Sequence, residues 1–258
     1  MALQNPRLVA FDLDDTLAPS KSPLDPRMAA LLVRLLGVAE VCVISGGQFA
    51  QFTMQVIDRL TAVDESALAR LHLMPTCGTQ YYRHRAGEWE QVYAENLTED
   101  QKERALSAVE ASARVLGYWE TETWGPILED RGSQITFSAL GQAAPVAAKT
   151  SWDTDGTKKT ALREAVQALL PDLEVRSGGS TSVDITRRGI DKAYGMNRLA
   201  ELTGVPLDDM LFVGDRLDEN GNDYPVKVLG VDCVAVDSWE DTATYLDELI
   251  LTLEPICP

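Results

Sequence analysis

A short apolar run that ends in carboxylates constrains this chain most. Leu8–Phe11 is long enough for a buried strand, and Asp12, Asp14, Asp15 and then Thr16 follow it within a few residues. Like charges crowded at one strand end are costly to desolvate, so we expect either a bound cation there or acids engaged in chemistry. In an open α/β sheet, ligands also bind at the carboxyl ends of the strands. The simpler alternative is an acidic turn in which Asp caps a helix.

Composition narrows the class of protein. The chain has 258 residues, 45% of them hydrophobic, which is enough for the core of one large domain or two smaller ones. A formal net charge of −17 argues against nucleic acid and anionic membrane surfaces as partners. Four scattered cysteines form no Cys-x-x-Cys pair, and residues 1–7 contain no apolar stretch typical of a signal peptide. We therefore expect a cytoplasmic protein.

The order of expected elements indicates two domains. Strands and helices alternate at both ends of the chain, which is typical of a parallel sheet, whereas the middle has strands in pairs. At the ends, the patterns predict helices at 26–36, 49–60, 191–202 and 240–251, and β segments at 8–11, 41–44, 73–77, 79–83, 89–93, 210–213 and 232–236. In the middle they predict helices at 99–116 and 157–170, and β segments at 118–124, 134–140, 173–176 and 181–185. We expect a core formed by residues 1–84 and 187–258, and an inserted α+β domain of residues 85–186.

Candidate chemistry stands at the ends of several expected strands. Asp12 and Asp14 end the first strand, Ser45 ends the second, and Asp215 begins an acidic loop that runs to Asp223. Ends of parallel strands meet at one sheet edge, and Lys192, at the start of a helix, can reach that edge. These are the groups that phosphoryl transfer needs, namely a nucleophilic carboxylate, a second acid for proton transfer, and carboxylates for Mg²⁺.

These motifs together resemble the haloacid dehalogenase (HAD) superfamily of phosphohydrolases. Asp12-Leu-Asp-Asp-Thr16 matches the first motif of that superfamily, Ser45 the second, Lys192 the third, and Asp215 with Asp223 the fourth. The long insert resembles the C2-type cap of subfamily IIB, which includes Cof-type sugar phosphatases, sucrose-phosphate phosphatase and eukaryotic-type phosphomannomutase. The resemblance implies a Rossmann-like α/β core with an inserted α+β cap that closes over the substrate.

The resemblance also implies roles for individual residues. Asp12 would be the nucleophile, Asp14 the general acid and base, and Lys192 the cation that neutralises Asp12 and the phosphate. The implied Mg²⁺ ligands are Asp12, Asp14 through its backbone carbonyl, Asp215 and Asp223. The implied phosphate-binding residues are Thr16, Ser45, Gly46 and Asn222. Asp15 is expected to take no part.

Phosphomannomutase is the most similar member of that class, but the match has departures. The run from Arg176 to Asp184 resembles its substrate-binding strand, so that Ser182 and Asp184 would contact the sugar or its phosphate, and Arg131 the distal phosphate. Trp124 and Gln142, however, stand where the mutase has arginines. The mutase also differs from this chain at Asp15, Ser45 and Asp215.

Three functional hypotheses follow. The first, which the smaller number of cap arginines favours, is a Mg²⁺-dependent phosphatase acting on a small sugar phosphate through an aspartyl phosphate. The second is a phosphomannomutase-like isomerase using the same intermediate. The third is a catalytically silent ligand-binding protein, which the intact acids disfavour. All three have a small phosphorylated molecule as partner, and the sequence specifies neither the sugar nor the oligomeric state.

Overall fold

The chain forms two compact units. The computed structural model describes residues 5–61, 63–178 and 181–254. One unit combines Met1–Tyr93 with Asp191–Pro258 and is called the core unit here; the other is Ala94–Ile190, called the insert unit. The core unit is therefore discontinuous in sequence, and each unit has a sheet of its own.

The core unit is built on a mostly parallel seven-stranded sheet. Its strand order is β11-β10-β1-β2-β3-β4-β5. The strands are β1 (Leu8–Phe11), β2 (Glu40–Ile44), β3 (Leu71–Met74), β4 (Gln80–Arg85), β5 (Glu88–Ala94), β10 (Met210–Gly214) and β11 (Asp232–Ala235). The strands from β11 to β3 run parallel, and β4 is antiparallel to β3. This confirms the expected α/β class.

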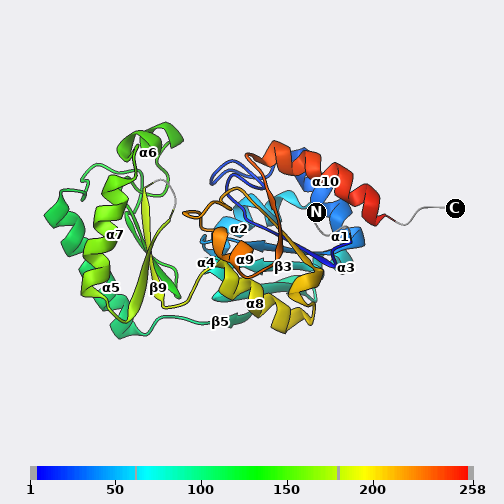
Figure 1. Cartoon of the computed structure of the whole chain (residues 1–258), viewed down its shortest axis with the longest axis horizontal. Coiled ribbons are helices and arrows are strands. Elements are labelled where there is room, and N and C mark those ends of the chain that lie inside the picture. The colour runs from blue at the N-terminus through cyan, green and yellow to red at the C-terminus, as the bar shows by residue number, and fades with distance from the viewer. Residues whose placement is uncertain (1–4, 62, 179–180, 255–258) are drawn as a thin grey trace. The chain divides into compact units, whose positions relative to one another are not determined.

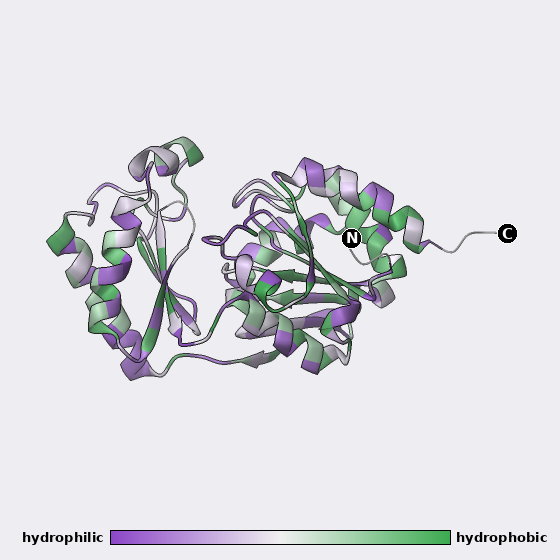
Figure 2. Ribbon diagram, viewed as in Figure 1, coloured by the Kyte–Doolittle hydropathy of each residue, from purple (hydrophilic) through white to green (hydrophobic). Residues whose placement is uncertain are grey.

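β1 lies in the middle of that sheet because it is apolar on both faces. All four of its residues are fully buried. Val9 faces the side of α1 (Pro26–Val38) and α10 (Trp239–Leu253), while Ala10 faces the side of α8 (Lys192–Thr203) and α9 (Tyr224–Val228). These two helical layers flank the sheet in Figure 1, and the apolar residues gather along the strands in Figure 2. A strand with a continuous apolar run is suited to such a position.

The remaining helical segments of the core unit are short. They are α2 (Phe49–Gln55), η1 (Ile57–Arg59), α3 (Glu65–Leu68), α4 (Pro75–Gly78) and η2 (Leu207–Asp209). Helix α1 begins as predicted, with the side chain of Asp25 accepting a hydrogen bond from the Arg27 amide and Pro26 in the first turn.

The insert unit is an antiparallel sheet with helices on one face. Its strand order is β6-β7-β9-β8, with α5 and α7 packed on the apolar side (Figure 1). The strands are β6 (Leu128–Asp130), β7 (Gln134–Ser138), β8 (Leu173–Ser177) and β9 (Ser182–Arg187), and the helices are α5 (Glu99–Leu116), α6 (Val146–Trp152) and α7 (Thr157–Leu169). The predicted capping box is present, since Thr98 and Gln101 exchange side-chain to backbone hydrogen bonds at the start of α5.

The boundaries between the two units differ from those expected from the sequence, because the expected boundaries would cut strands. A break between residues 84 and 85 would cut β4, and a break between 186 and 187 would cut β9. β4 and β5 are joined by Ala86 and Gly87 and both extend the core sheet, so the first boundary lies after β5. The second lies after Ile190, just before α8 begins.

Several single elements differ from the expectations. Residues 118–124 form no strand, the helix expected at 49–60 ends at Gln55, α6 and β6 were not predicted, and β3 ends at Met74 rather than at residue 77. The last difference places a turn, rather than a strand, beside the candidate site.

Among the described residues, no helix combines the length and the apolar character needed to cross a membrane.

Candidate active site

The parallel strands bring three predicted groups to one edge of the core sheet. Asp12 follows β1, Ser45 follows β2 and Asp215 follows β10, and these three strands are neighbours with β1 between the other two. The backbone amide of Asp12 donates to the carbonyl of Val213 at 3.0 Å, which extends the β1–β10 pairing to the acid itself. Asp12 and Asp215 are therefore fixed relative to each other by the sheet.

A buried lysine lies among three of the acids. Lys192, the first residue of α8, is 1% exposed, and its Nζ donates to Oδ1 of Asp12 at 2.5 Å and to Oδ1 of Asp223. One carboxylate oxygen from each of Asp12, Asp215 and Asp223 lies within 4.8 Å of the other two. Thr16 is fully buried and donates from Oγ1 to Asp215 at 3.4 Å.

The electrostatics of this cluster fit a divalent cation. Burial raises the pKa of Asp12 well above its ordinary value; Lys192 opposes this effect, and the charges of Asp223 and Asp215 add to it. Burial, with the charge of Asp223, also raises the pKa of Asp215. Burial alone lowers the pKa of Lys192, but the carboxylates of Asp12 and Asp223 raise it overall. With all three acids charged, three carboxylates and one ammonium leave two negative charges, which one divalent cation held by carboxylate oxygens would balance.

The loop after β10 is folded tightly to present Asp223. The amide of Arg216 donates to Oδ2 of Asp223 at 3.1 Å, and the amide of Asp223 donates back to the carbonyl of Arg216. A Cβ at Gly221 would lie 1.8 Å from that carbonyl oxygen, and one at Gly214 would lie 2.4 Å from Oδ2 of Asp223. Glycine is required at both positions for the loop to close on the acid. Asn222 is exposed beside Asp223.

The loop after β2 is held by an unusual turn. Ser45 is buried, and its Oγ accepts from the Gly47 amide at 3.2 Å. The carbonyls of Ser45 and Gly47 in turn accept from the amides of Cys77 and Thr76, each at 3.0 Å. Thr76 and Cys77 have φ of 50° and 55°, in the left-handed region that β-branched residues rarely adopt, and Gly78 follows with φ of 85°.

Asp14 is in a different environment from the other acids. Its Oδ1 accepts from the Lys21 amide at 2.7 Å and from Nε2 of Gln55 at 3.2 Å, while its Oδ2 accepts from Nε2 of Gln51 at 3.0 Å. Both oxygens are thus occupied by donors from the following loop and from α2.

The candidate substrate residues lie in the insert unit, on the polar face of its sheet. Nη2 of Arg131 pairs with Oε2 of Glu129 at 2.6 Å. The hydroxyls of Ser182 and Ser138 are 3.0 Å apart, and Asp184 accepts from Oγ1 of Thr136 at 2.7 Å. Each of these residues makes polar contacts within its own unit.

No role was predicted from the sequence for Gln51, Gln55, Thr76 or Cys77. A signal was present for the glutamines, because two residues four apart on a predicted helix share one face, directly after Ser45-Gly-Gly. No signal marked Thr76 and Cys77, since both residue types are common in strands or neutral there.

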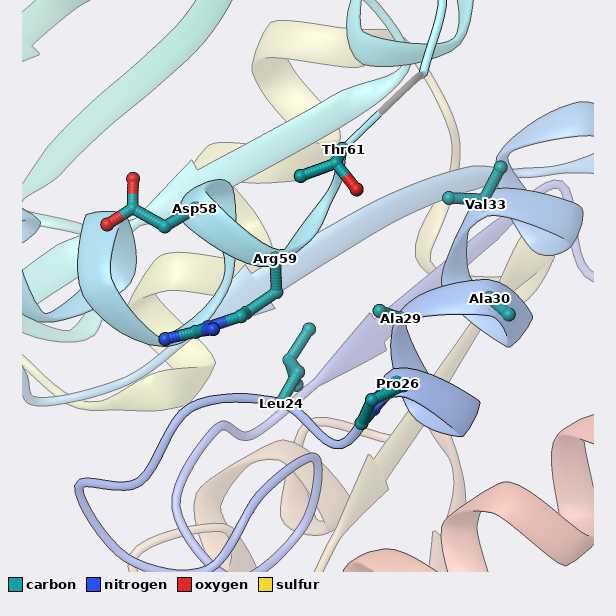
Figure 3. A pocket seen from close by; sticks show the side chains of 8 residues that line it. All are labelled: Leu24, Pro26, Ala29, Ala30, Val33, Asp58, Arg59 and Thr61. Atoms are coloured by element: carbon teal, nitrogen blue, oxygen red, sulfur yellow. The ribbon is translucent and has the colours of Figure 1, made fainter.

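A separate pocket of about 400 Å³ lies elsewhere in the core unit. Its lining combines apolar and polar side chains, and Figure 3 shows Arg59 of η1 on one side of it and the labelled side chains of α1 on the other. The lining residues are Leu24, Pro26, Ala29, Ala30, Val33, Asp58, Arg59 and Thr61. None of the predicted site residues belongs to it, so the acidic edge remains the candidate site.

Fold and site together describe an α/β protein with a candidate divalent-metal centre at the carboxyl edge of a parallel sheet. A family model for haloacid dehalogenase-like hydrolases matches residues 138–225. The chain is also 22% identical to human phosphomannomutase 1 over 85% of its own length and 82% of that protein.

Two solved structures share the fold. An IMP-nucleotidase of Plasmodium falciparum matches with a TM-score of 0.71 at 12% identity, covering 96% of this chain and 68% of that one. A haloacid dehalogenase-like hydrolase of Bacteroides thetaiotaomicron matches with a TM-score of 0.60 at 16% identity, covering 95% of this chain and 99% of that one. The chain is thus similar to haloacid dehalogenase-like hydrolases in part of its sequence and to phosphomannomutase over most of its length, which supports an enzyme that acts on phosphate esters.

Proposed function

We propose that this protein is a Mg²⁺-dependent phosphatase that hydrolyses a small sugar phosphate through an aspartyl phosphate. The observation that carries the proposal is the cluster of Asp12, Lys192, Asp215 and Asp223 at the sheet edge, in which all but Asp215 are buried. A carboxylate beside a buried ammonium and a candidate metal site is suited to attack a phosphorus atom, because the charge of the transferred group is neutralised on several sides.

The reaction divides into two steps. In the first, a carboxylate oxygen of Asp12 attacks phosphorus, the ester P–O bond breaks, and the leaving oxygen takes its electron pair and a proton from Asp14. In the second, water attacks the same phosphorus and gives its proton to Asp14, the bond to Asp12 breaks, and inorganic phosphate leaves. A bound magnesium ion would supply charge neutralisation at the phosphoryl oxygens.

Other residues of the edge hold the phosphoryl group. The hydroxyls of Thr16 and Ser45 and the backbone amide of Gly46 provide donors, and Asn222 completes the set. Lys192 favours the charged form of Asp12 and offsets the charge of the phosphate. Thr16 and Ser45 are both buried, and they follow the neighbouring strands β1 and β2, which supports this assignment.

Hydrolysis is favoured over isomerisation by the charge of the insert sheet. A mutase must bind a bisphosphate in either orientation, which calls for cations available to the second phosphate. Three arginines of the insert unit already pair with carboxylates. These pairs are Arg131 with Glu129 at 2.6 Å, Arg176 with Glu174 at 3.7 Å, and Arg187 with Glu95 at 2.6 Å. A second phosphate would have to compete with these carboxylates, whereas a neutral sugar would not.

The second candidate function is a phosphomannomutase-like isomerisation between hexose 1- and 6-phosphates. The relatives named phosphomannomutase favour it, since the one in yeast is 25% identical over 94% of this chain. Ser182 and Asp184 would then contact the sugar or its phosphate, and Arg131 the distal phosphate. A catalytically silent binding protein is the third candidate, and the complete set of acids disfavours it.

A substrate panel separates these candidates. Purified protein with Mg²⁺ is incubated with hexose 1-phosphates and 6-phosphates, with and without a hexose bisphosphate, and both free phosphate and isomerised product are measured. Phosphate release without isomerisation supports the proposal. Isomerisation that depends on the bisphosphate supports the mutase instead. The phosphatase proposal fails if a broad panel, including an aryl phosphate, releases no phosphate.

A further inference from the structure

Two glutamine side chains of helix α2 donate hydrogen bonds to the carboxylate of Asp14. Gln51 and Gln55 are four residues apart on one face of α2, and their Nε2 atoms lie 3.0 and 3.2 Å from Oδ2 and Oδ1 of Asp14. The Lys21 amide gives Oδ1 a second donor at 2.7 Å. Because donors reach both oxygens from two sides, rotation of the Asp14 carboxylate is blocked.

The orientation of the Gln55 amide is determined by its neighbours. Its Nε2 also donates to the carbonyl of Ser22 at 2.7 Å, so two acceptors face the same nitrogen and the reversed amide would place oxygen against oxygen. The Oε1 atom is consequently left buried without a hydrogen-bond partner among the described residues. Buried carbonyl groups almost always accept a hydrogen bond. Leaving Oε1 of Gln55 without a donor costs free energy, so we expect this orientation of the side chain to have a compensating role.

We propose that Gln51 and Gln55 are positioning residues that hold the Asp14 carboxylate in the place from which it exchanges a proton with the leaving group. The inference rests on the proposed phosphatase function. Neither glutamine touches the reacting atoms; both act through Asp14. Proton transfer in a transition state requires the acid to lie within hydrogen-bond reach of the leaving oxygen, and a carboxylate free to rotate would reach it only part of the time.

A purely structural role is the competing explanation. The backbone carbonyl of Gln55 accepts from the Leu24 amide at 2.9 Å, and its side chain contacts Ser22, so Gln55 also anchors the loop that leads to α1. Loss of that anchor would lower activity on every substrate to a similar extent. Loss of acid positioning would instead act mainly on substrates whose leaving group needs a proton.

The experiment therefore compares two leaving groups. The value of kcat/KM, which reports the steps up to formation of the aspartyl phosphate, is measured with an alkyl phosphate and with p-nitrophenyl phosphate, whose leaving group departs without protonation. The variants are Gln51→Met and Gln55→Met, which keep side-chain volume and remove the donors. Gln48→Met is the matched control, because Gln48 is exposed at the start of α2 and its side chain makes no capping hydrogen bond.

We expect Gln51→Met to lower kcat/KM for the alkyl phosphate by about 10- to 100-fold and for p-nitrophenyl phosphate by less than about 3-fold. Gln48→Met should change neither value. Gln51 is partly exposed, so its variant is the main test, and the melting temperature of each variant is recorded. An equal fall on both substrates, or no fall, overturns the inference and leaves the phosphatase proposal standing. A wild-type protein inactive on both substrates overturns the phosphatase proposal, and the inference with it.

Discussion

Asp12 and Asp15 are near in sequence but differ in what surrounds them. Asp12 is 4% exposed and bonded to Lys192, whereas Asp15 is exposed, has φ of 65°, and accepts a hydrogen bond from the Ser20 amide at 3.0 Å. Asparagine can keep the hydrogen bond at position 15 and tolerates a left-handed backbone. The same substitution can therefore be made at the proposed nucleophile and at a nearby acid with no proposed role.

We predict that Asp12→Asn lowers phosphatase kcat at least about a thousand-fold, because an amide cannot form the acyl phosphate. Asp15→Asn should leave kcat within about 3-fold of wild type. Phosphate release from the most active substrate of the panel measures both, with circular dichroism to verify folding. Full turnover by Asp12→Asn would exclude the aspartyl-phosphate mechanism.

A second residue-scale feature is a buried histidine in the core sheet. Nε2 of His72 lies 2.5 Å from Oε2 of Glu40, and Nδ1 lies 2.7 Å from the hydroxyl of Tyr81, while Arg83 is its partner across the sheet. Burial lowers the pKa of His72, and the hydrogen bond from His72 lowers the pKa of Glu40. Both shifts correspond to a neutral ring that donates to a charged carboxylate.

We predict that stability depends on this histidine in mildly acidic solution. In the unfolded chain, the His72 ring takes up a proton near its ordinary pKa of about 6.5. In the folded chain, burial disfavours the protonated ring. The free energy of unfolding should be at its full value above about pH 7 and fall by about 1 kcal/mol as the pH drops to about 5.5. Urea midpoints across this range measure it. His72→Gln should flatten the slope, and a slope that survives His72→Gln would refute the assignment.

At the scale of elements, helix α8 packs unusually closely on the left-handed turn of Thr76–Gly78. A Cβ at Gly195 would lie 2.8 Å from the carbonyl oxygen of Cys77 and 2.3 Å from Cδ1 of Ile44. A Cβ at Gly78 would likewise lie 2.6 Å from Cα of Gly195. The turn that holds the Ser45 loop is therefore in direct contact with the helix that begins at Lys192.

We predict opposite outcomes for two helical Gly→Ala changes. Gly195→Ala should lower the free energy of unfolding by about 1–3 kcal/mol, since the new methyl group meets backbone atoms. It should also lower phosphatase activity, because α8 must shift and carries Lys192 with it. Gly37→Ala in α1 meets nothing within 4 Å and should raise stability by about 0.5–1 kcal/mol. Chemical denaturation and kcat of both variants measure this; a neutral Gly195→Ala would contradict the close packing.

The elements that the sequence predicted well have strong local causes. α5 has a capping box at Thr98 and is capped by Gly117 with φ of 73°, and β1 and β10 are continuous apolar runs. The turn at Thr76 and Cys77 was missed because its left-handed backbone is stabilised by contacts with the Ser45 loop, which no local pattern shows. The hydrogen bonds from Gln51 and Gln55 to Asp14 likewise depend on tertiary contacts, which no local pattern shows. The positions of the acids themselves could be predicted from the order of the strand ends.

At the scale of the whole molecule, each buried hydrophobic cluster of the described residues belongs to one unit. The cluster of the insert unit runs from Leu97 to Ile185, and the two clusters of the core unit contain no residue of that range. Each unit can thus bury its own apolar surface, which is the main requirement for independent folding.

We predict that residues 94–190 fold when produced alone. The fragment should show a helical circular dichroism signal and a single sigmoidal urea transition. Phe137→Ala, at a fully buried position, should lower its stability by about 3–5 kcal/mol. Val115→Ala, at a position 86% exposed, should change it by less than about 0.5 kcal/mol. A fragment without a cooperative transition would show that the insert unit depends on the core unit.

The central place of β1 in the core sheet has a consequence for synthesis on the ribosome. β1 leaves the ribosome before the insert, and its partner β10 follows only after the whole insert, about 10 to 40 s later at ordinary translation rates. During that time one edge of β1 is uncovered, so nascent chains that stop before Met210 should be prone to aggregation. Asp215 and Asp223 arrive with β10 and the loop after it. A growing chain therefore carries its candidate nucleophile well before the other acids of the candidate site are synthesised.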